Sequence, residues 1–428
     1  MVKPGYKQTK IGVIPEDWET SSLSAAFQKL EAGVSVNSDN SLSSEYHILK
    51  TSAVHDGVVD TAETKPVIPQ DYLRLKCPLV KGSIIISRMN TPALVGECGF
   101  TKDAKTGTYL PDRLWQIQNF NKSSFDFVWL NYLLNTKQYR DAVRATATGT
   151  SNSMKNISKE RMLDIEIPRP PINEQENIAA ALSEVDELIN LVEKQIDKKK
   201  AIKQGAIQEL LTGKRRLPGF SEAWETFVFG DLFDFIPNNA FTRVQLSGSG
   251  KVKNIHYGDI LTKFGAYISA DSNEIPYIKK EIDLSRFAEK CYLQSGDVII
   301  ADTAEDETVG KALEVINVEC PVLAGQHTLL CRPKVNFAEK FLGYYLNAAC
   351  YHDQLLPFIV GTKVSSISKA SIAQTRLVVP KYKEQQAISC VLSDMDDEIT
   401  ELEKKLEKYR EVKQGMMQQL LTGKIRLV

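Results

Sequence analysis

The sequence lacks the long apolar runs, paired cysteines and clustered histidines that mark several classes of protein. No stretch reaches the roughly 18 consecutive apolar residues of a spanning helix, and residues 1–12 lack the apolar run of a secretory signal. The seven cysteines are widely spaced with no CxxC pair, and the five histidines are scattered. A disulfide scaffold is excluded, zinc and redox sites are not indicated, and we expect a reducing, cytoplasmic location without membrane contact.

An excess of charge of either sign is also missing. Lys plus Arg number 53 and Asp plus Glu 54, which gives a net charge of −1 over 428 residues. This sum does not exclude nucleic-acid binding, because a near-zero total can hide one basic and one acidic face. The hydrophobic fraction of 43% is ordinary for a globular chain of two to four domains.

Catalytic signatures are missing as well. The chain has no glycine-rich dinucleotide fingerprint, no HExxH or GxSxG motif, and no Asn-Pro-Pro-aromatic motif of the kind found in adenine methyltransferases. Residues 249–251 read Ser-Gly-Lys, but Gln245 and Val252 replace the Gly and the Ser or Thr of a phosphate loop. We therefore predict a non-catalytic chain with no metal site.

The most informative feature that is present is an internal repeat. Residues 174–217 and 384–427 align without a gap at an offset of 210, and 21 of the 44 positions are identical. Upstream, Trp18-Glu19-Thr20 corresponds to Trp224-Glu225-Thr226. The chain is therefore predicted to be a pseudo-two-fold repeat, in which each half is a globular region, here called a head, followed by a helical segment.

Each helical segment has the spacing of a coiled-coil seam, with apolar residues at alternating steps of four and three. The first seam comprises Ile178, Leu182, Val185, Ile189, Val192 and Ile196. The second comprises Ile388, Leu392, Met395, Ile399, Leu402, Leu406 and Tyr409. A solvated face over a core is the alternative, but helices of about 40 residues, roughly 60 Å, are longer than a small domain is wide. We therefore expect an intramolecular antiparallel pair.

Two features interrupt the helical pattern. The seams meet Lys199, Lys203 and Lys413, where we expect a phase shift before Leu210, Leu211, Leu420 and Leu421 restore burial. The identical segments Lys203-Gln204-Gly205 and Lys413-Gln414-Gly415 place a glycine in mid-helix, at a cost of up to ~1 kcal/mol. Close packing of the two helices or a docked partner would explain these glycines, and we favour close packing.

The heads are predicted to be mixed α/β. Strands are expected at 83–87, 114–118, 297–301 and 328–331, and helices at 125–135 and 337–349. The expected fold class is thus α/β, with two mixed α/β domains separated by two long helices that form the antiparallel coiled coil. Heads that share only scattered residues are typical of a bivalent reader that binds two different targets.

These motifs together resemble the specificity subunit of type I restriction–modification systems. The resemblance is carried by Ile-Pro-Glu-Asp-Trp-Glu at 14–19, Arg-Leu-Pro-Gly-Phe at 216–220, the Pro-Pro and Glu174-Gln175 entry to the first helix, and Leu-Leu-Thr-Gly-Lys leaving both helices. It covers essentially the whole chain. It implies a first target-recognition domain at 1–168, a first spacer helix region at 169–216, a second target-recognition domain at 217–380 and a second spacer helix region at 381–428.

The resemblance also implies partners and a division of labour. Each recognition domain would read one half of a bipartite, asymmetric site in double-stranded DNA, while the coiled coil sets the gap and docks two modification (methyltransferase) subunits. Restriction subunits would complete the complex. No cofactor is expected on this chain, because S-adenosylmethionine, ATP and magnesium would belong to the partner chains. The competing interpretation is a non-catalytic coiled-coil adaptor that bridges two proteins without reading DNA, and a third makes the chain itself an enzyme.

Candidate DNA contacts follow from side-chain chemistry. Hydroxyl-rich loops beside a lysine suit phosphate contacts, and Arg or Asn can bond two atoms of a base edge. The phosphate candidates are Thr148, Gly149, Thr150, Ser151, Asn152 and Lys155 in the first half, and Gly361, Thr362, Lys363, Ser365 and Ser366 in the second. The groove candidates are Arg88, Asn90, Arg113, Arg243 and Lys251. Because Ala301-Asp302 replaces Ser87-Arg88 in the second half, we expect the two heads to read different bases.

Overall fold

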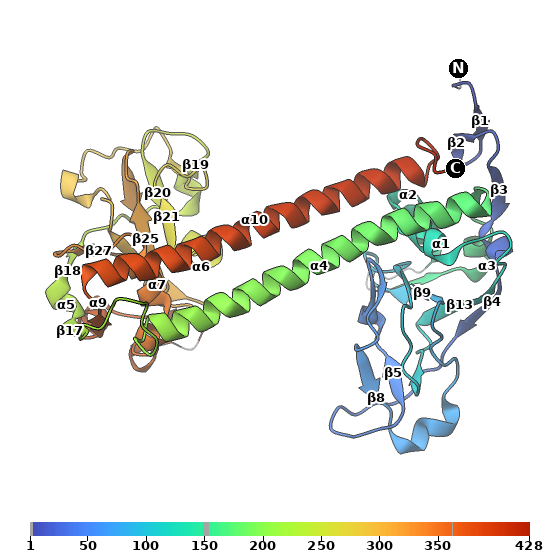
Figure 1. Cartoon of the computed structure of the whole chain (residues 1–428), viewed down its shortest axis with the longest axis horizontal. Helices are drawn as coiled ribbons and strands as arrows, with labels where there is room; N and C mark the ends of the chain where they lie inside the picture. Colours follow the sequence, from blue (N-terminus) through green and yellow to red (C-terminus); the bar gives the residue numbers. More distant parts are fainter. Residues whose placement is uncertain (1–2, 149–153, 362) are drawn as a thin grey trace. The chain divides into compact units, whose positions relative to one another are not determined.

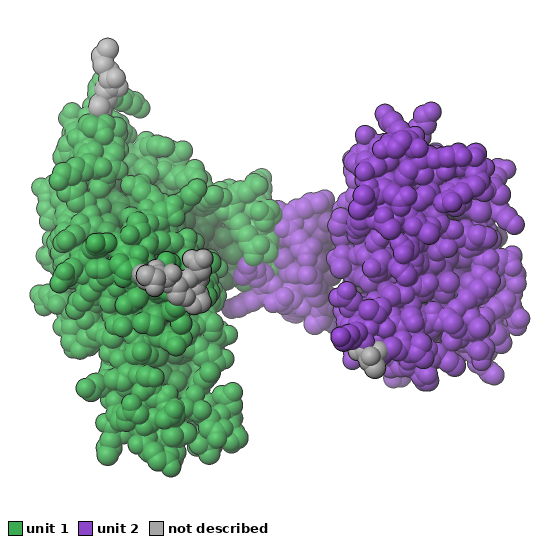
Figure 2. Space-filling model, turned by 180° about the vertical axis from the view of Figure 1, so that it is seen from behind, with its two compact units in different colours: residues 1–192, 405–428 green, residues 193–404 purple. Residues whose placement is uncertain are grey.

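The computed structural model describes residues 3–148, 154–361 and 363–428. The chain divides into two compact units, Met1–Val192 with Lys405–Val428 (unit 1), and Glu193–Lys404 (unit 2), which Figure 2 distinguishes by colour. The long helices α4 (Ile172–Leu210) and α10 (Tyr382–Leu420) each contribute one part to each unit. Each unit therefore contains one head together with a stretch of both long helices.

The head of unit 1 is built on a six-stranded sheet with the order β4-β13-β9-β11-β7-β6. Its strands are β4 (Phe27–Ala32), β6 (Val54–His55), β7 (Gly57–Val59), β9 (Ile84–Ser87), β11 (Cys98–Phe100) and β13 (Leu114–Phe120). Its helices are α1 (Phe127–Leu134), α2 (Lys137–Ala145) and α3 (Lys159–Leu163). The Asp126 side chain caps α1 by accepting from the Trp129 N–H at 2.7 Å, which starts the helix where its apolar face meets the sheet.

The head of unit 2 repeats this plan on a five-stranded sheet with the order β18-β27-β23-β25-β21. Its strands are β18 (Phe233–Ile236), β21 (Tyr267–Ser269), β23 (Val298–Ala301), β25 (Ala312–Ile316) and β27 (Thr328–Pro333). Its helices are α5 (Phe229–Leu232), α6 (Tyr257–Thr262), α7 (Phe341–Asn347), α8 (Ala349–His352) and α9 (Lys369–Ala373). The strand order matches the first five strands of the other head, so the heads share a fold despite their dissimilar sequences.

Smaller sheets complete both heads. In unit 1 they are β1 (Tyr6–Thr9) with β2 (Gly12–Pro15), β3 (Glu19–Ser22) with β16 (Glu166–Arg169), β12 (Thr108–Tyr109) with β5 (His47–Leu49) and β8 (Thr64–Pro66), and β10 (Met89–Asn90) with β15 (Lys155–Ile157) and β14 (Ala147–Thr148). In unit 2 they are β17 (Glu225–Val228) with β29 (Arg376–Val379), β19 (Leu246–Ser247) with β22 (Tyr277–Ile278), β20 (Lys253–Ile255) and β26 (Val322–Ala324), and β24 (Thr303–Ala304) with β28 (Ser365–Ser366).

The two long helices run antiparallel within each unit and share the core of its head (Figure 1). In unit 1, Leu182 of α4 and Leu420 of α10 belong to one hydrophobic cluster with Trp129 of the head. In unit 2, Leu210 of α4 and Leu392 of α10 belong to one cluster with Phe341 of the head. No residue of either predicted seam is exposed, which confirms the coiled-coil spacing. No helix of the described chain is both long and apolar enough to span a membrane.

The expected phase shift at the lysines is wrong. Both helices are unbroken, and the steps of four and three continue through Lys203 and Lys413 to the buried Leu210 and Leu420. A lysine is tolerated at these seam positions because a carboxylate of the other helix forms an ion pair with it. Lys203 forms an ion pair with Asp396, while its aliphatic stem is largely buried.

This seam contact includes a tyrosine from the head and occurs twice. The Tyr344 hydroxyl donates to Asp396 at 2.5 Å, and the Lys203 ammonium lies 5.4 Å from the centre of the tyrosine ring. Burial, and then the bond to Asp396, raises the pKa of the Tyr344 phenol, so it stays protonated as a donor. Unit 1 repeats the arrangement with Tyr132, Asp186 and Lys413. The Tyr132 hydroxyl donates to Asp186 at 2.6 Å, and the Lys413 ammonium pairs with Asp186 at 2.7 Å.

The motifs that recur in the sequence form the junctions between heads and helices. Arg426, after α10, binds Glu174 at the start of α4 and Asp17, and its guanidinium covers the ring of Trp18. Trp18 donates its indole N–H to the same buried Glu174 at 2.8 Å. In unit 2 the corresponding residues are Arg216, Glu384 and Trp224. These motif residues therefore hold each head on the helices.

The preferred explanation for the mid-helix glycines is also wrong. Both Gly205 and Gly415 are exposed, and a Cβ atom added at either one would meet no atom within 4 Å. Neither glycine is thus needed for close approach of the two helices. The expected strands and helices of the heads, in contrast, coincide with β9, β13, β23, β27, α1 and α7 to within a few residues.

Candidate nucleic-acid interface

The first head gathers several candidates where the chain leaves strand β9. The Arg88 N–H donates to the carbonyl of Arg113 at 3.0 Å, and the Arg88 carbonyl accepts from the Ile157 N–H at 2.9 Å. Directly afterwards β10 pairs with β15, which sets Asn90 opposite Lys155. These bonds bring Arg88, Asn90, Arg113 and Lys155, separated by up to 67 positions in sequence, to one small region.

The side chains of this region differ in how far they are already engaged. The Arg88 guanidinium lies 5.5 Å from the centre of the Trp115 ring, and its buried Nε has no hydrogen-bond partner among the described residues. The Asn90 amide donates to Ser87 Oγ at 3.1 Å and accepts from the Thr91 N–H at 2.8 Å. Arg113 is exposed. Of the groove candidates here, Arg88 and Arg113 keep donors available for a ligand.

The phosphate candidates flank this region. Thr148 of β14 pairs with Asn156 of β15, and its hydroxyl donates to the Asn156 carbonyl at 3.4 Å. In the second head, Gly361 has a φ of +125° and a Cβ would come within 2.0 Å of the Val364 carbonyl oxygen, so only glycine fits this turn. Lys363 is exposed and Ser365 and Ser366 are half-buried. Gly149, Thr150, Ser151, Asn152 and Thr362 lie outside the described residues.

The second head has the same backbone arrangement with different side chains. The Asp302 N–H donates to the His327 carbonyl at 3.2 Å, and the Asp302 carbonyl accepts from the Ile367 N–H at 2.9 Å. Strand β24 then pairs with β28, which sets Thr303 opposite Ser366. Asp302 therefore occupies the place of Arg88, as the alignment of residues 87–88 with 301–302 predicts, and His327 occupies the place of Arg113.

Sequence reasoning missed a polar cluster at this position. The Thr303 hydroxyl donates to Asp302 Oδ1 at 2.8 Å, and His327 Nδ1 lies 3.8 Å from the same oxygen. The ring of Tyr257 meets His327 edge-on at 5.2 Å. Tyr257, Thr303, His327 and Val364 line a cavity of about 420 Å³. The signal that could have found this cluster is the repeat offset, because Asp302 aligns with the groove candidate Arg88 although it is a carboxylate rather than a basic, amide or hydroxyl residue.

The remaining two groove candidates lie elsewhere in unit 2. Arg243 is held by the buried Asp259 through two bonds of 2.9 and 2.8 Å, which fix it at the start of α6. The neighbouring His256 caps this helix by accepting the Gly258 N–H on Nδ1 at 3.1 Å, and burial, then the charge of Arg243, lowers its pKa. Lys251 is exposed just before β20.

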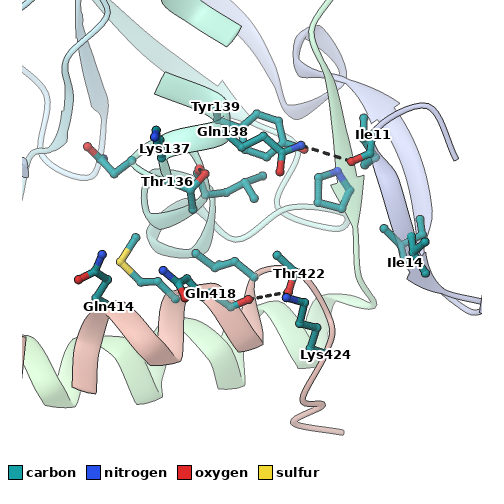
Figure 3. Close-up of a pocket in the computed structure, with 16 residues that line it drawn as sticks. Ile11, Ile14, Thr136, Lys137, Gln138, Tyr139, Gln414, Gln418, Thr422 and Lys424 are labelled. Atoms are coloured by element: carbon teal, nitrogen blue, oxygen red, sulfur yellow. Dashed lines mark hydrogen bonds between the residues drawn. The ribbon is translucent and has the colours of Figure 1, made fainter. Parts of the chain in front are cut away.

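Unit 1 has a further concavity, shown in Figure 3, beside the end of α10. This cavity of about 410 Å³ lies between the β1–β2 hairpin, the turn joining α1 to α2, and the last turns of α10. Its wall includes Leu133, Tyr139 and Met417, and Lys137 and Lys424 are the charged residues among the described part of its lining. Across the described ranges, no three His, Cys, Asp or Glu side chains are grouped so that they could hold a metal ion.

Comparison with known proteins gives a consistent result. The family model described as the type I restriction modification DNA specificity domain matches residues 15–201 and again 221–413. The putative type I restriction enzyme MjaX specificity subunit of Methanocaldococcus jannaschii is 25% identical, with 99% of this chain and 97% of the relative covered. The MjaVIII specificity subunit of the same organism is 23% identical, with 97% and 94% covered.

Solved structures show the same fold. The S subunit of a type I restriction–modification system from M. genitalium superposes with a TM-score of 0.56 at 16% identity, covering 94% of this chain and 96% of that one. A chain from a structure concerned with complex assembly and conformational transition of the type I R-M system gives a TM-score of 0.55 at 15% identity, covering 96% and 99%.

Proposed function

Because the chain belongs to the type I restriction–modification DNA specificity family, we propose that it is the non-catalytic, sequence-reading subunit of such a system. Each head reads one half of a bipartite, asymmetric site in double-stranded DNA. The observation that carries this proposal is one fold presenting different chemistry at one position, with Arg88 and Arg113 in the first head and Asp302 and His327 in the second. Different side chains on equivalent backbone suit two unlike half-sites.

The candidate contacts divide into two groups under this proposal. Thr148 and Lys155 in the first head, and Lys363 and Ser366 in the second, contact phosphates and set the register of each head on the duplex. The side chains at the ends of β9 and β23 contact base edges. Arg243 serves instead to hold α6, because both of its bonds to Asp259 are already formed.

The two helices set the unread gap and dock two copies of the modification subunit. The support is the repeat itself, since Ile202 and Gly205 on α4 correspond to Val412 and Gly415 on α10, and all four are exposed. Two equivalent surfaces suit two copies of one partner. S-adenosylmethionine, ATP and magnesium are then bound by the modification and restriction subunits, and methylation and cleavage take place there.

Exchange of one head tests the reading of half-sites. The segment between β3 and β16 is replaced by that of a related specificity chain, which leaves the β3–β16 pair and the junction at Glu174 intact. Both versions are produced with the modification subunit in cells that lack other adenine methylation, and methylated adenines are mapped across the genome. We expect half of the methylated sequence to change and half to persist. A bridging protein that ignores DNA would leave the methylated sequence unaltered.

A steric substitution tests docking. Trp at Gly205 or Gly415 projects into the proposed docking surface, and Ala at the same position is the matched control because open space surrounds both glycines. With purified modification subunit, we expect Gly205→Trp to reduce the complex from two bound copies to one, and the double Trp variant to bind none. Unchanged stoichiometry, measured by native mass spectrometry, would place the docking surface elsewhere.

A further inference from the structure

The loops that leave β9 and β23 have the same backbone course but opposite charge. Residues 88–96 and 302–310 align at an offset of 214, and both end in Val-Gly. The Gly96 N–H donates to the Ser87 carbonyl and the Gly310 N–H to the Ala301 carbonyl, each at 2.8 Å. The first loop contains one arginine and no carboxylate. The second contains no Lys or Arg and has four carboxylates, which are Asp302, Glu305, Asp306 and Glu307.

Arg88 is prepared to donate hydrogen bonds to a ligand. Its guanidinium is supported by the Trp115 ring, and among the described residues it forms no ion pair and no side-chain hydrogen bond. The backbone on both sides is fixed by the bonds to Arg113 and Ile157. A guanidinium held in place with free donors matches the two acceptors that guanine presents in the major groove.

Asp302 has a carboxylate oxygen available to accept a hydrogen bond from a ligand. Its Oδ1 takes the Thr303 hydroxyl and faces His327, while Oδ2 has no hydrogen bond within the described part of the chain. The side chain is about a quarter exposed at 26%. A DNA phosphate would repel a carboxylate at this position. On DNA, the Asp302 carboxylate is therefore stabilised only where a base offers it a hydrogen-bond donor. The donors that duplex DNA presents in the major groove are the amino groups of cytosine and adenine.

We propose that positions 88 and 302 are paired specificity-determining positions. Arg88 recognises a guanine in the half-site of the first head, and Asp302 recognises an exocyclic amino group, of cytosine or adenine, in the half-site of the second. The assignment rests on the proposed function, since it requires that both heads face DNA. It adds a base-reading site, made by Asp302 with Thr303 and His327, in a head where basic residues alone would not reveal one.

Methylation maps of single variants test the proposal in the assembled complex. Arg88→Ala is expected to relax one base pair, a guanine in the unvaried sequence, in one half-site. Asp302→Ala is expected to relax one base pair, read through an amino group, in the other half-site. Discrimination at that pair should fall roughly 10- to 100-fold, as for loss of one good base contact, while the other half-site stays unchanged. The map also shows whether Asp302 reads cytosine or adenine.

Matched variants separate base reading from charge and folding. Arg88→Lys keeps the charge but loses the planar fork, so the guanine preference should still fall. Glu307→Ala and Lys122→Ala remove exposed charges from the same two heads and should leave both half-sites unchanged. Thermal melting and complex assembly are measured for every variant. If folded, assembled Arg88→Ala and Asp302→Ala complexes methylate the original sequence, the assignment is wrong. If the unvaried complex yields no bipartite sequence at all, the proposed function itself fails.

Discussion

The seam carboxylate of unit 2 gives the most detailed prediction for stability. Asp396 accepts the Tyr344 hydroxyl at 2.5 Å and pairs with Lys203, which occupies an apolar position of the helix pair. Asp396→Asn removes the charge that both contacts use. A hydrogen bond to a charged group contributes about 1.5–3 kcal/mol, and the partial exposure of the Lys203 and Asp396 side chains, 21% and 29%, reduces the ion-pair share. We expect a loss of about 2–3 kcal/mol in the free energy of unfolding.

Urea unfolding measures this loss of free energy, and amide hydrogen exchange of α4 and α10 shows where in the helices it occurs. A double-mutant cycle of Asp396→Asn with Lys203→Met should give a coupling of about 1–2 kcal/mol, because removing both partners leaves no unpaired charge. Glu401→Gln, which breaks the exposed pair with Lys404, is the control and should have no measurable effect. A loss below about 0.5 kcal/mol for Asp396→Asn would refute the view that the carboxylate holds the lysine in the seam.

Three further predictions concern the same scaffold. Gly205→Ala and Gly415→Ala should each raise helix stability by roughly 0.5–1 kcal/mol, because no atom opposes the added methyl group, and a lower melting temperature would contradict this. Arg426→Met removes the cationic partner of the buried Glu174, which keeps the Trp18 hydrogen bond, and should cost roughly 3 kcal/mol in urea unfolding of unit 1, whereas no change would argue against the junction. Burial raises the pKa of Glu314 to about 7, so its contribution to folding is present below about pH 4.5 and is lost as the pH rises through 7. Glu314→Gln should therefore flatten this part of the profile of melting temperature against pH. Parallel profiles for the two proteins would contradict the raised pKa of Glu314.

The helix pair was predictable because apolar periodicity is a local signal. The alternating steps through Ile178 and Ile388 identify both seams, and their length requires that they bury each other. Periodicity counts only apolar residues, however, and so it treated Lys203 as a break. The carboxylate that permits a lysine there comes from a residue 193 positions away, Asp396, and no local pattern reports such a pair.

The heads show the same limit. Individual strands such as β9 follow from their β-branched residues, but their order depends on pairings between distant segments. The gathering of Arg88 and Lys155 depends on one such pairing. The site at Asp302 was missed because a carboxylate differs from the usual basic contact. The alignment with Ser87-Arg88 marks its position, but only the structure shows that Thr303 and His327 lie beside it.

The most direct test of the central claim lengthens the helices. Seven residues that continue the heptad pattern are inserted into both α4 and α10, after Val192 and after Lys404, so that both seams keep their phase. Each helix becomes about 10 Å longer, which corresponds to roughly three base pairs of duplex DNA. In the methylation map we expect both half-sites to persist with a gap about three base pairs wider. Unchanged spacing between unchanged half-sites would contradict the claim that the paired helices set the distance between two reading heads.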